Sequence, residues 1–256
     1  MEKGDVTILM KKPIYPVSTE LRKYLRAYQR EAKLPIGYYD LLNFYESFPL
    51  MDKHGKDTLW ESPLYPYHEI ERIHNGLKKT YAMLKASGNL RIVEHKYIDR
   101  IDYCTFGNSN PFRIRIVNRL NDIYDYFYIK RADASRIYGL ELEEIFSPNQ
   151  VNYLVDDNTL VEEHIAGIPG DVFAKTRLDH PDYNPKRIAK EFVKFNERCK
   201  ITLLGDMRAY NFVMQITPDF EDFQFRLRAI DFDQQFYEGN FKVYMPQFFK
   251  ENLPYV

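Results

Sequence analysis

Apolar residues recur at helical spacing in residues 18–35 and again in residues 68–88, falling three, four and seven positions apart. Ser18 and Thr19 are the N-cap candidates of the first run, and Gly88 follows the second as a stop signal. The stretch between the two runs is rich in proline and charged residues, which predicts a loop. We therefore expect a helical N-terminal extension over residues 1–94.

The pattern then changes to dense β-branched and aromatic residues. Turn sequences, "FGNSNP" and "NRLND", divide this part into three predicted strands at 97–105, 112–118 and 124–130. A helix is predicted over 134–146, and a strand, an Asp-Asp-Asn turn and a second strand over 151–167. This β-β-β-α-β-β order predicts an α+β fold with a five-stranded antiparallel sheet.

The last part of the chain begins with a predicted helix in "NPKRIAKEFVKFNERCK". A short apolar strand, "ITLLGD", is predicted next. "NFVMQIT" and "FQFRLRAIDFD" are separated by "PDFED" and predict a β-hairpin.

Composition narrows the classes of partner. The formal net charge is −1 over 256 residues, so no basic field of the kind that nucleic-acid binders use is expected. No apolar run approaches 18 residues, and the N-terminus lacks the apolar core of a signal peptide, so no membrane partner is expected. Two cysteines make no disulfide framework, which favours reduced thiols and a cytoplasmic location.

Candidate chemistry lies in "LLGDMRAYNFV", where Asn211 follows Asp206 by five residues. A second pair with the same spacing lies in the Pro-rich loop "LDHPDYNP", with no strand on either side. The first pair precedes the predicted hairpin, whose far strand ends at Asp231 and Asp233. Because a hairpin folds back on itself, Asn211 and Asp231 are expected to lie close together. Oxygen ligands of this kind suit Mg²⁺, with phosphates and water completing the site.

These segments support a resemblance. "GDMRAYN" followed by "IDFD" resembles the catalytic segments of the protein-kinase-like superfamily, closest to its aminoglycoside and choline phosphotransferase branch. "YFYIKRAD", "GLELEEIF" and "LVEEHIAGIP" resemble, in the required order, the lysine strand, the helix with its glutamate partner, and the hinge. The resemblance covers residues 95–240. It implies a bilobal fold with an N-lobe at 95–167 and a reduced helical C-lobe at 168–256.

The resemblance also implies residue roles in a phosphotransfer reaction. Asp206 would accept the proton of the attacking hydroxyl, and Arg208 would neutralise charge on the transferred phosphoryl group. Asn211 and Asp231 would hold Mg²⁺, and Asp233 is either a second carboxylate at the metal or a turn residue. The remaining predicted residues would bind ATP: Lys130 the phosphates, with Glu141 or Glu144 as its partner; Gly107, Asn108 and Ser109 in the phosphate-binding turn; and the backbone of Glu163, His164 and Ile165 at the adenine.

Two hypotheses about function follow. The first is an ATP- and Mg²⁺-dependent phosphotransferase that acts on a hydroxyl of a small-molecule acceptor. The alternative is a catalytically silent relative that binds nucleotide, or a protein partner through its N-terminal helices. Leu204 stands where the branch carries a histidine, and the phosphate turn has one glycine, which keeps the alternative open.

Asp231 offers a way to separate metal chemistry from architecture. If it is a metal ligand near Asp206, Asp231→Asn should leave the apo protein as stable as wild type or slightly more stable, because repulsion is removed. If it accepts hydrogen bonds from backbone N–H groups, the substitution should cost about 1–3 kcal/mol. We expect the first result.

Overall fold

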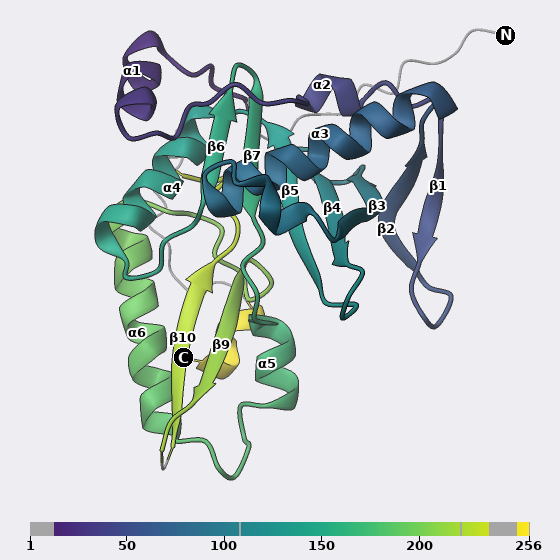
Figure 1. The fold of residues 1–256 in the computed structure, drawn as a ribbon. Helices are drawn as coiled ribbons and strands as arrows, with labels where there is room; N and C mark the ends of the chain where they lie inside the picture. The colour runs from purple at the N-terminus through teal and green to yellow at the C-terminus, as the bar shows by residue number, and fades with distance from the viewer. Residues whose placement is uncertain (1–12, 108, 221, 236–249, 256) are drawn as a thin grey trace, which may run out of the picture. The chain divides into compact units, whose positions relative to one another are not determined.

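The computed structural model of the chain describes residues 13–107, 109–220, 222–235 and 250–255. The chain folds into two compact units (Figure 1). Unit 1 contains residues 1–134 and 153–162, and unit 2 contains residues 135–152 and 163–256. Helices and antiparallel strands occur in both units, so the predicted α+β class is confirmed. The predicted domain boundaries at 94 and 167 stay a prediction.

Unit 1 is built on a seven-stranded sheet in the order β1-β2-β3-β4-β5-β7-β6. The prediction of five strands is therefore wrong by two. Antiparallel registers join β1 to β2, β2 to β3, β3 to β4, β4 to β5, and β6 to β7. The strands are β1 (Glu46–Met51), β2 (Asp57–Leu64), β3 (Lys96–Cys104), β4 (Phe112–Asn118), β5 (Tyr124–Arg131), β6 (Tyr153–Asp156) and β7 (Thr159–Glu163).

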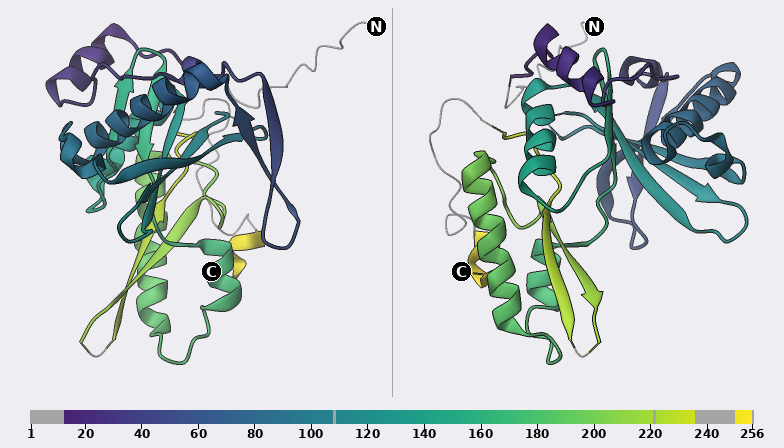
Figure 2. Two further views of the ribbon diagram at one scale, coloured as in Figure 1. Left: turned by 45° about the vertical axis from the view of Figure 1, so that its right-hand side comes forward. Right: turned by 60° about the vertical axis from the view of Figure 1, so that its left-hand side comes forward.

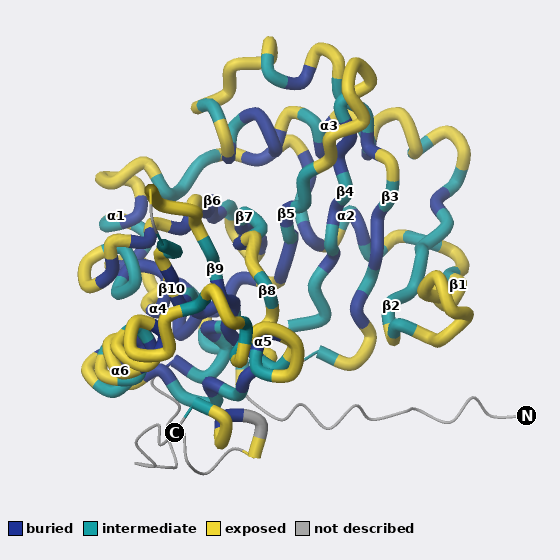
Figure 3. The backbone as a smooth tube through the Cα atoms, turned by 90° about the horizontal axis from the view of Figure 1, so that it is seen from below, coloured by how far each residue is buried: buried dark blue, intermediate teal, exposed yellow. Residues whose placement is uncertain are grey.

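The two unpredicted strands, β1 and β2, lie where proline and charged residues predicted loop or helix. β1 is largely exposed and β2 is largely half-buried, as the yellow and teal colouring in Figure 3 shows, and no described residue of either strand is buried. They therefore carry no clear apolar alternation. They form by pairing with each other, and β2 joins the sheet through Trp60 opposite Cys104 and Glu61 opposite Tyr103. Such strands are set by their partners, which a sequence window does not contain.

The other predicted strands of unit 1 are confirmed, whereas the first predicted helix already ends at Ala27. β3, β4 and β5 begin and end within one residue of the predicted strands. The predicted helix α4 (Ala134–Phe146), which lies mostly in unit 2, is also confirmed and has the predicted bounds. Asp157 turns the β6–β7 hairpin in a left-handed conformation with φ 48°.

The core of unit 1 forms between α3 (Tyr67–Ala86) and one face of the sheet, with the short 3-10 helix η1 (Leu90–Val93) following α3 (Figure 1). The predicted apolar stripe is buried at Ile73, Leu77 and Tyr81. It packs against strand side chains that alternate toward the helix, which are Ile98, Phe112, Ile114, Ile116, Phe127 and Ile129. The predicted stop is also correct, since Ser87 and Gly88 leave the helix with positive φ.

The segment of residues 18–41, which we call the N-terminal strap, covers the free edge of β6. Its helices are α1 (Thr19–Ala27), with Ser18 as the predicted N-cap, and α2 (Tyr38–Leu41). Between them, Val155 of β6 donates its N–H to the Arg30 carbonyl and accepts the Ala32 N–H. The strap thereby pairs backbone groups that an edge strand would otherwise expose.

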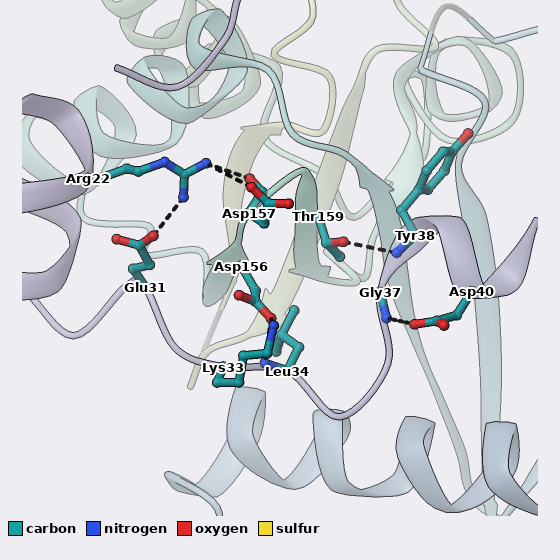
Figure 4. Close-up of polar contacts among 10 residues, drawn as sticks. All are labelled: Arg22, Glu31, Lys33, Leu34, Gly37, Tyr38, Asp40, Asp156, Asp157 and Thr159. Atoms are coloured by element: carbon teal, nitrogen blue, oxygen red, sulfur yellow. Dashed lines mark hydrogen bonds and ion pairs between the residues drawn. The ribbon is translucent and has the colours of Figure 1, made fainter. Parts of the chain in front are cut away.

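Polar side chains fasten the strap to the β6–β7 hairpin (Figure 4). The Asp156 carboxylate accepts the backbone N–H of Leu34 at 2.8 Å, and the Thr159 hydroxyl accepts that of Tyr38 at 2.9 Å. Arg22 bridges the Glu31 carboxylate at 2.6 Å and the Asp157 carbonyl at 2.8 Å. Residues 18–41 are thus an integral part of the sheet unit.

Unit 2 contains most of α4, the helices α5 (Gly170–Thr176) and α6 (Pro185–Thr202), and a three-stranded sheet in the order β10-β9-β8. β8 spans Ile168–Pro169, β9 Phe212–Pro218 and β10 Phe223–Ala229, and a 3-10 helix, η3, spans Lys250–Tyr255. The β9–β10 hairpin is the predicted one. α6 lies along this hairpin in both views of Figure 2 and buries Phe192 and Phe195 against Phe212.

The strand predicted in residues 201–206 is wrong. α6 continues to Thr202, and Leu203 ends the helix in a left-handed conformation with φ 55°. Only Leu204 makes a bridge, an isolated antiparallel one with Gln235. An apolar run this short fits the last turn of a buried helix as well as it fits a strand.

Candidate active site

The loop between α6 and β9 holds Asp206 in a defined backbone geometry. Asp206 has φ 53°, a left-handed conformation that a non-glycine residue adopts only at some cost. Its carbonyl accepts hydrogen bonds from the Arg208 N–H at 2.8 Å and the Asn211 side-chain amide at 2.7 Å. The Asn211 N–H in turn donates to the Arg208 carbonyl at 2.8 Å. These bonds fix the loop while the Asp206 side chain stays 37% exposed.

Arg208 contacts the predicted base directly. Its Nε lies 3.0 Å from Oδ1 of Asp206, and its side chain is 42% exposed. A guanidinium at this distance holds the carboxylate in one orientation. The loop therefore presents one negative and one positive group side by side to solvent.

The hairpin brings Asp231 next to this loop, as its sequence predicts. Phe212 opposes Ala229 in the register of β9 and β10, and the Ile230 N–H donates to the Asn211 carbonyl at 3.0 Å. Asp231 is the next residue, so it follows directly from the end of the pairing. Its side chain is 36% exposed.

Sequence reasoning missed the residue that holds the two hairpin carboxylates. Nη1 of Arg136, on α4, lies 3.1 Å from Oδ1 of Asp231 and 2.7 Å from Oδ1 of Asp233. The Arg136 side chain is only 2% exposed, whereas that of Asp233 is 13% exposed. Oδ1 of Asp231 also accepts the Asp233 N–H at 2.9 Å. We call these three residues the Arg136 triad. An arginine in the first turn of an amphipathic helix gives no signal of burial in sequence.

Close packing keeps α4 against the segment that carries the triad. A Cβ built at Gly139, three residues after Arg136, would lie 3.0 Å from side-chain atoms of Phe232, so only glycine allows this approach. The Ser135 hydroxyl donates to the Gln235 carbonyl at 2.5 Å. Three consecutive contacts on one helix face thus anchor residues 231–235.

The C-terminal 3-10 helix supports the same loop from the other end of the chain. The buried Asn252 amide donates to the Met207 carbonyl at 2.9 Å, between Asp206 and Arg208. The Tyr255 hydroxyl donates to the Gly170 carbonyl at 2.6 Å. Asn252 is a second residue that local sequence patterns did not identify.

In unit 1, Lys130 of β5 forms a buried ion pair. Its Nζ lies 2.9 Å from Oε2 of Glu162 on β7, and the two side chains are 9% and 6% exposed. Nζ also lies 5.4 Å from the centre of the Tyr128 ring, whose pKa is raised by burial. Glu162 was not named from the sequence, because the lysine partner was sought on the following helix.

The partners predicted for Lys130, Glu141 and Glu144, are on α4 in unit 2. Glu141 is buried and Glu144 is half-buried. The pairing of either residue with Lys130 stays a prediction.

The predicted phosphate turn between β3 and β4 is organised by Asn110. This residue has φ 40°, its N–H donates to the Gly107 carbonyl at 3.2 Å, and its side-chain amide donates to the Cys104 carbonyl at 3.0 Å. The Tyr38 hydroxyl of the strap donates to the Asn110 carbonyl. Ser109 lies in the turn, and Asn108 lies outside the described residues. Among the described residues of the turn, Asn110 is the one with a positive φ.

The predicted hinge begins at the end of β7. The Glu163 N–H donates to the Asn152 carbonyl at 3.0 Å, and the Glu163 carboxylate accepts the Asn152 N–H at 2.8 Å. His164 follows, and Ile165 is buried. A backbone contact of residues 163–165 with adenine stays a prediction.

The donor set of the hairpin fits a magnesium ion that arrives with phosphates. Asn211 supplies an amide, and Asp231 and Asp233 supply carboxylates, all hard oxygen donors. Within the described residues, no three His, Cys, Asp or Glu side chains converge as a complete metal site. Phosphate and water oxygens would therefore have to supply the remaining ligands.

The second Asp/Asn pair has a purely local contact pattern. Asn184 is the N-cap of α6, and its side chain accepts the N–H groups of Lys186 and Arg187 at 3.1 and 3.4 Å. Pro185 occupies the first helical position, as is common after such a cap. This pair supplies a matched control for the Asp206 loop.

Comparisons with known proteins found similar solved structures but no matching family model or curated protein. Among solved structures, the chain is similar to the Rio2 kinase–ADP/Mg²⁺-phosphoaspartate complex from Chaetomium thermophilum. The match has a TM-score of 0.44 and 10% identity, and covers 92% of this chain and 67% of that one. No helix in the described part of the chain is long and apolar enough to span a bilayer.

Proposed function

We propose that the chain is an ATP- and Mg²⁺-dependent phosphotransferase that acts on a hydroxyl of a small-molecule acceptor. One observation carries the proposal. In unit 2, the loop that presents Asp206 and Arg208 is bonded to the strand end that presents Asp231, and these side chains stay at least one-third exposed. Phosphoryl transfer depends on fixed charges of this kind more than on a special nucleophile.

Asp206 would position the acceptor. Its carboxylate would accept the hydroxyl proton of the substrate while Arg208 holds Oδ1. Because the Asp206 carbonyl accepts hydrogen bonds from both Arg208 and Asn211, the backbone that carries the carboxylate is fixed. Arg208 would also neutralise charge on the transferred phosphoryl group.

Each unit supplies candidate residues for nucleotide binding. Lys130 would pair with the phosphates, and the contact with Glu162 supports a role of Glu162 in orienting the ammonium group. Asn211 and Asp231 would hold Mg²⁺, with Asp233 next to them. Bound Mg·ATP would supply the phosphoryl group and neutralise charge between its phosphates.

The Arg136 triad favours the alternative of a silent nucleotide-binding relative. A buried guanidinium already contacts both carboxylates that would hold the metal. The leucine at position 204, where a histidine is expected, points the same way. In this case nucleotide would bind without being turned over.

A turnover screen across hydroxyl acceptors, with and without Mg²⁺, tests the proposal. Wild type should consume ATP with at least one acceptor, and Asp206→Asn should not. Asp179→Asn changes the exposed aspartate of the other Asp/Asn pair and should retain wild-type activity. Nucleotide binding without turnover for any acceptor would favour the silent relative, and absence of nucleotide binding would exclude both.

A further inference from the structure

The Arg136 triad places a buried positive charge between two proposed metal ligands. The guanidinium is 2% exposed, so it depends on the protein to balance its charge. Asp231 and Asp233 together supply two negative charges, which leaves the triad with one net negative charge. Half-exposed Asp231 is the member through which solvent reaches the triad.

A divalent cation near these carboxylates would be repelled by Arg136 at short range. In a site partly shielded from water this repulsion is only weakly screened. Nucleotide phosphates would add several negative charges, whose attraction for the ion would outweigh its repulsion by Arg136. The arginine would therefore have opposite consequences for a free ion and for an ion that arrives with a nucleotide.

We propose that Arg136 is a positioning residue that occupies the metal carboxylates in place of a free cation, so that Mg²⁺ binds only together with a nucleotide. It holds Oδ1 of Asp231 and Oδ1 of Asp233 in one geometry and suppresses binding of the bare ion. The inference rests on the proposed function for the identity of the nucleotide. The charge argument itself concerns only the triad.

The packing of α4 makes this arrangement rigid. Gly139 brings the helix into contact with Phe232, and the Ser135 hydroxyl is bonded to the Gln235 carbonyl. Arg136 lies between these two contacts in sequence, so the backbone from which its side chain extends is fixed. From there the guanidinium reaches both carboxylates at 3.1 and 2.7 Å.

The test is a titration of the full chain with Mn²⁺, followed by the electron paramagnetic resonance signal of the free ion. We expect wild type to bind free Mn²⁺ no tighter than millimolar, and to bind it at least tenfold tighter when ADP is present. Arg136→Gln removes the positive charge and should bind free Mn²⁺ at least tenfold tighter than wild type without ADP.

Two further variants test whether a gain in Mn²⁺ affinity comes from loss of the charge of Arg136, from a change in the shape of its side chain, or from general destabilisation. Arg136→Lys keeps the charge and should bind free Mn²⁺ as weakly as wild type. Arg113→Gln removes an arginine that donates two hydrogen bonds to the buried Asp102 carboxylate in unit 1, at 2.9 and 2.8 Å. It should lose stability without gaining affinity for Mn²⁺.

Tight binding of free Mn²⁺ by wild type, or unchanged binding in Arg136→Gln, would overturn the inference. If Arg136→Gln does not fold, the same comparison is made between Asp233→Asn and the double variant Arg136→Gln with Asp233→Asn. A gain in Mn²⁺ affinity in the double variant supports the inference, and no gain overturns it. Failure of wild type to bind Mn²⁺ with ADP counts against the proposed function, and the comparison between variants still decides the role of Arg136.

Discussion

The two units handle a buried positive charge in different ways. In unit 1, Lys130 and Glu162 are both less than 10% exposed and lie 2.9 Å apart. In unit 2, Arg136 is equally buried, but Asp231 and Asp233 are 36% and 13% exposed. We call Lys130 and Glu162 the sealed pair, because both side chains are almost fully buried. In the Arg136 triad the cation is buried, but its carboxylates are partly exposed to solvent.

The difference indicates which site can accept a ligand without unfolding. To bind phosphate, Lys130 would have to share or leave a partner in a region of low dielectric constant, which costs free energy. The triad has a partly exposed carboxylate, so a cation that arrives with nucleotide phosphates can approach it from solvent. We therefore expect the lysine pair to dominate stability and the triad to dominate metal response.

The largest effect is expected on breaking the sealed pair. Lys130→Met leaves Glu162 buried without its lysine and should lower the free energy of unfolding by about 3–5 kcal/mol. Adding Glu162→Leu removes the stranded charge and should restore most of the loss. Urea unfolding measures both, and a loss below about 1 kcal/mol in Lys130→Met would show that the pair is not sealed.

A smaller effect is expected from ligand binding to wild type. At 100 times its dissociation constant, Mg·ADP should stabilise the protein by about 2.7 kcal/mol. Thermal shift with millimolar Mg·ADP measures this, with Asp179→Asn as the control that should respond equally. The absence of any shift would contradict nucleotide binding. The difference between the Lys130–Glu162 pair and the Arg136 triad would then have no role in ligand binding.

The sequence predicts some helices and strands of the two units well and misses others. Periodicity predicted β3, β4, β5, α4 and the β9–β10 hairpin, because each element carries its own apolar pattern. It could not predict β1 and β2, which have no buried residue and which join the rest of the described sheet only through the pairing of β2 with the sequence-distant β3. The hairpin argument correctly placed Asn211 beside the Asp231 segment, since that contact follows from local folding.

The residues that sequence reasoning missed share a physical cause. Glu162, Arg136 and Asn252 are polar side chains that are buried by contacts with segments remote in sequence. Their partners lie between 32 and 97 residues away, so no window around each residue could identify them. The same cause makes Asn184 deceptive, since its spacing from Asp179 matches the candidate motif although its side chain only caps α6.

We expect Asp231→Asn to lower the stability of the apo protein and also to remove its response to Mg²⁺ with ADP. Asp231 accepts the Asp233 N–H and contacts Arg136, so the apo protein should lose about 1–3 kcal/mol rather than match wild type. Stabilisation by Mg²⁺ with ADP should also be lost. Urea unfolding with and without Mg·ADP measures the two effects. An unchanged apo stability would mean that the amide oxygen accepts the same hydrogen bonds and that the negative charge beside Arg136 adds no stability.

The smallest effect is expected at a third charge cluster, in which one carboxylate faces two arginines. Burial raises the pKa of Glu143 above its ordinary value, although a hydrogen bond from Ser147 and the charges of Arg198 and Arg228 oppose the rise. Because the folded-state pKa is above the unfolded-state value, the unfolded chain binds fewer protons in the interval between them. Stability must therefore fall as pH rises through that interval.

Glu143→Gln tests this sign. The variant should lose the fall in stability and be at least as stable as wild type at pH 7, because no buried carboxylate then has to ionise. Urea unfolding from pH 4 to pH 8 measures the slope. Glu197→Gln, on the exposed face of α6, is the matched control and should keep the wild-type slope. If Glu143→Gln also keeps that slope, the two arginines compensate the buried carboxylate fully, and burial of a charge in unit 2 costs no more than in the sealed pair of unit 1.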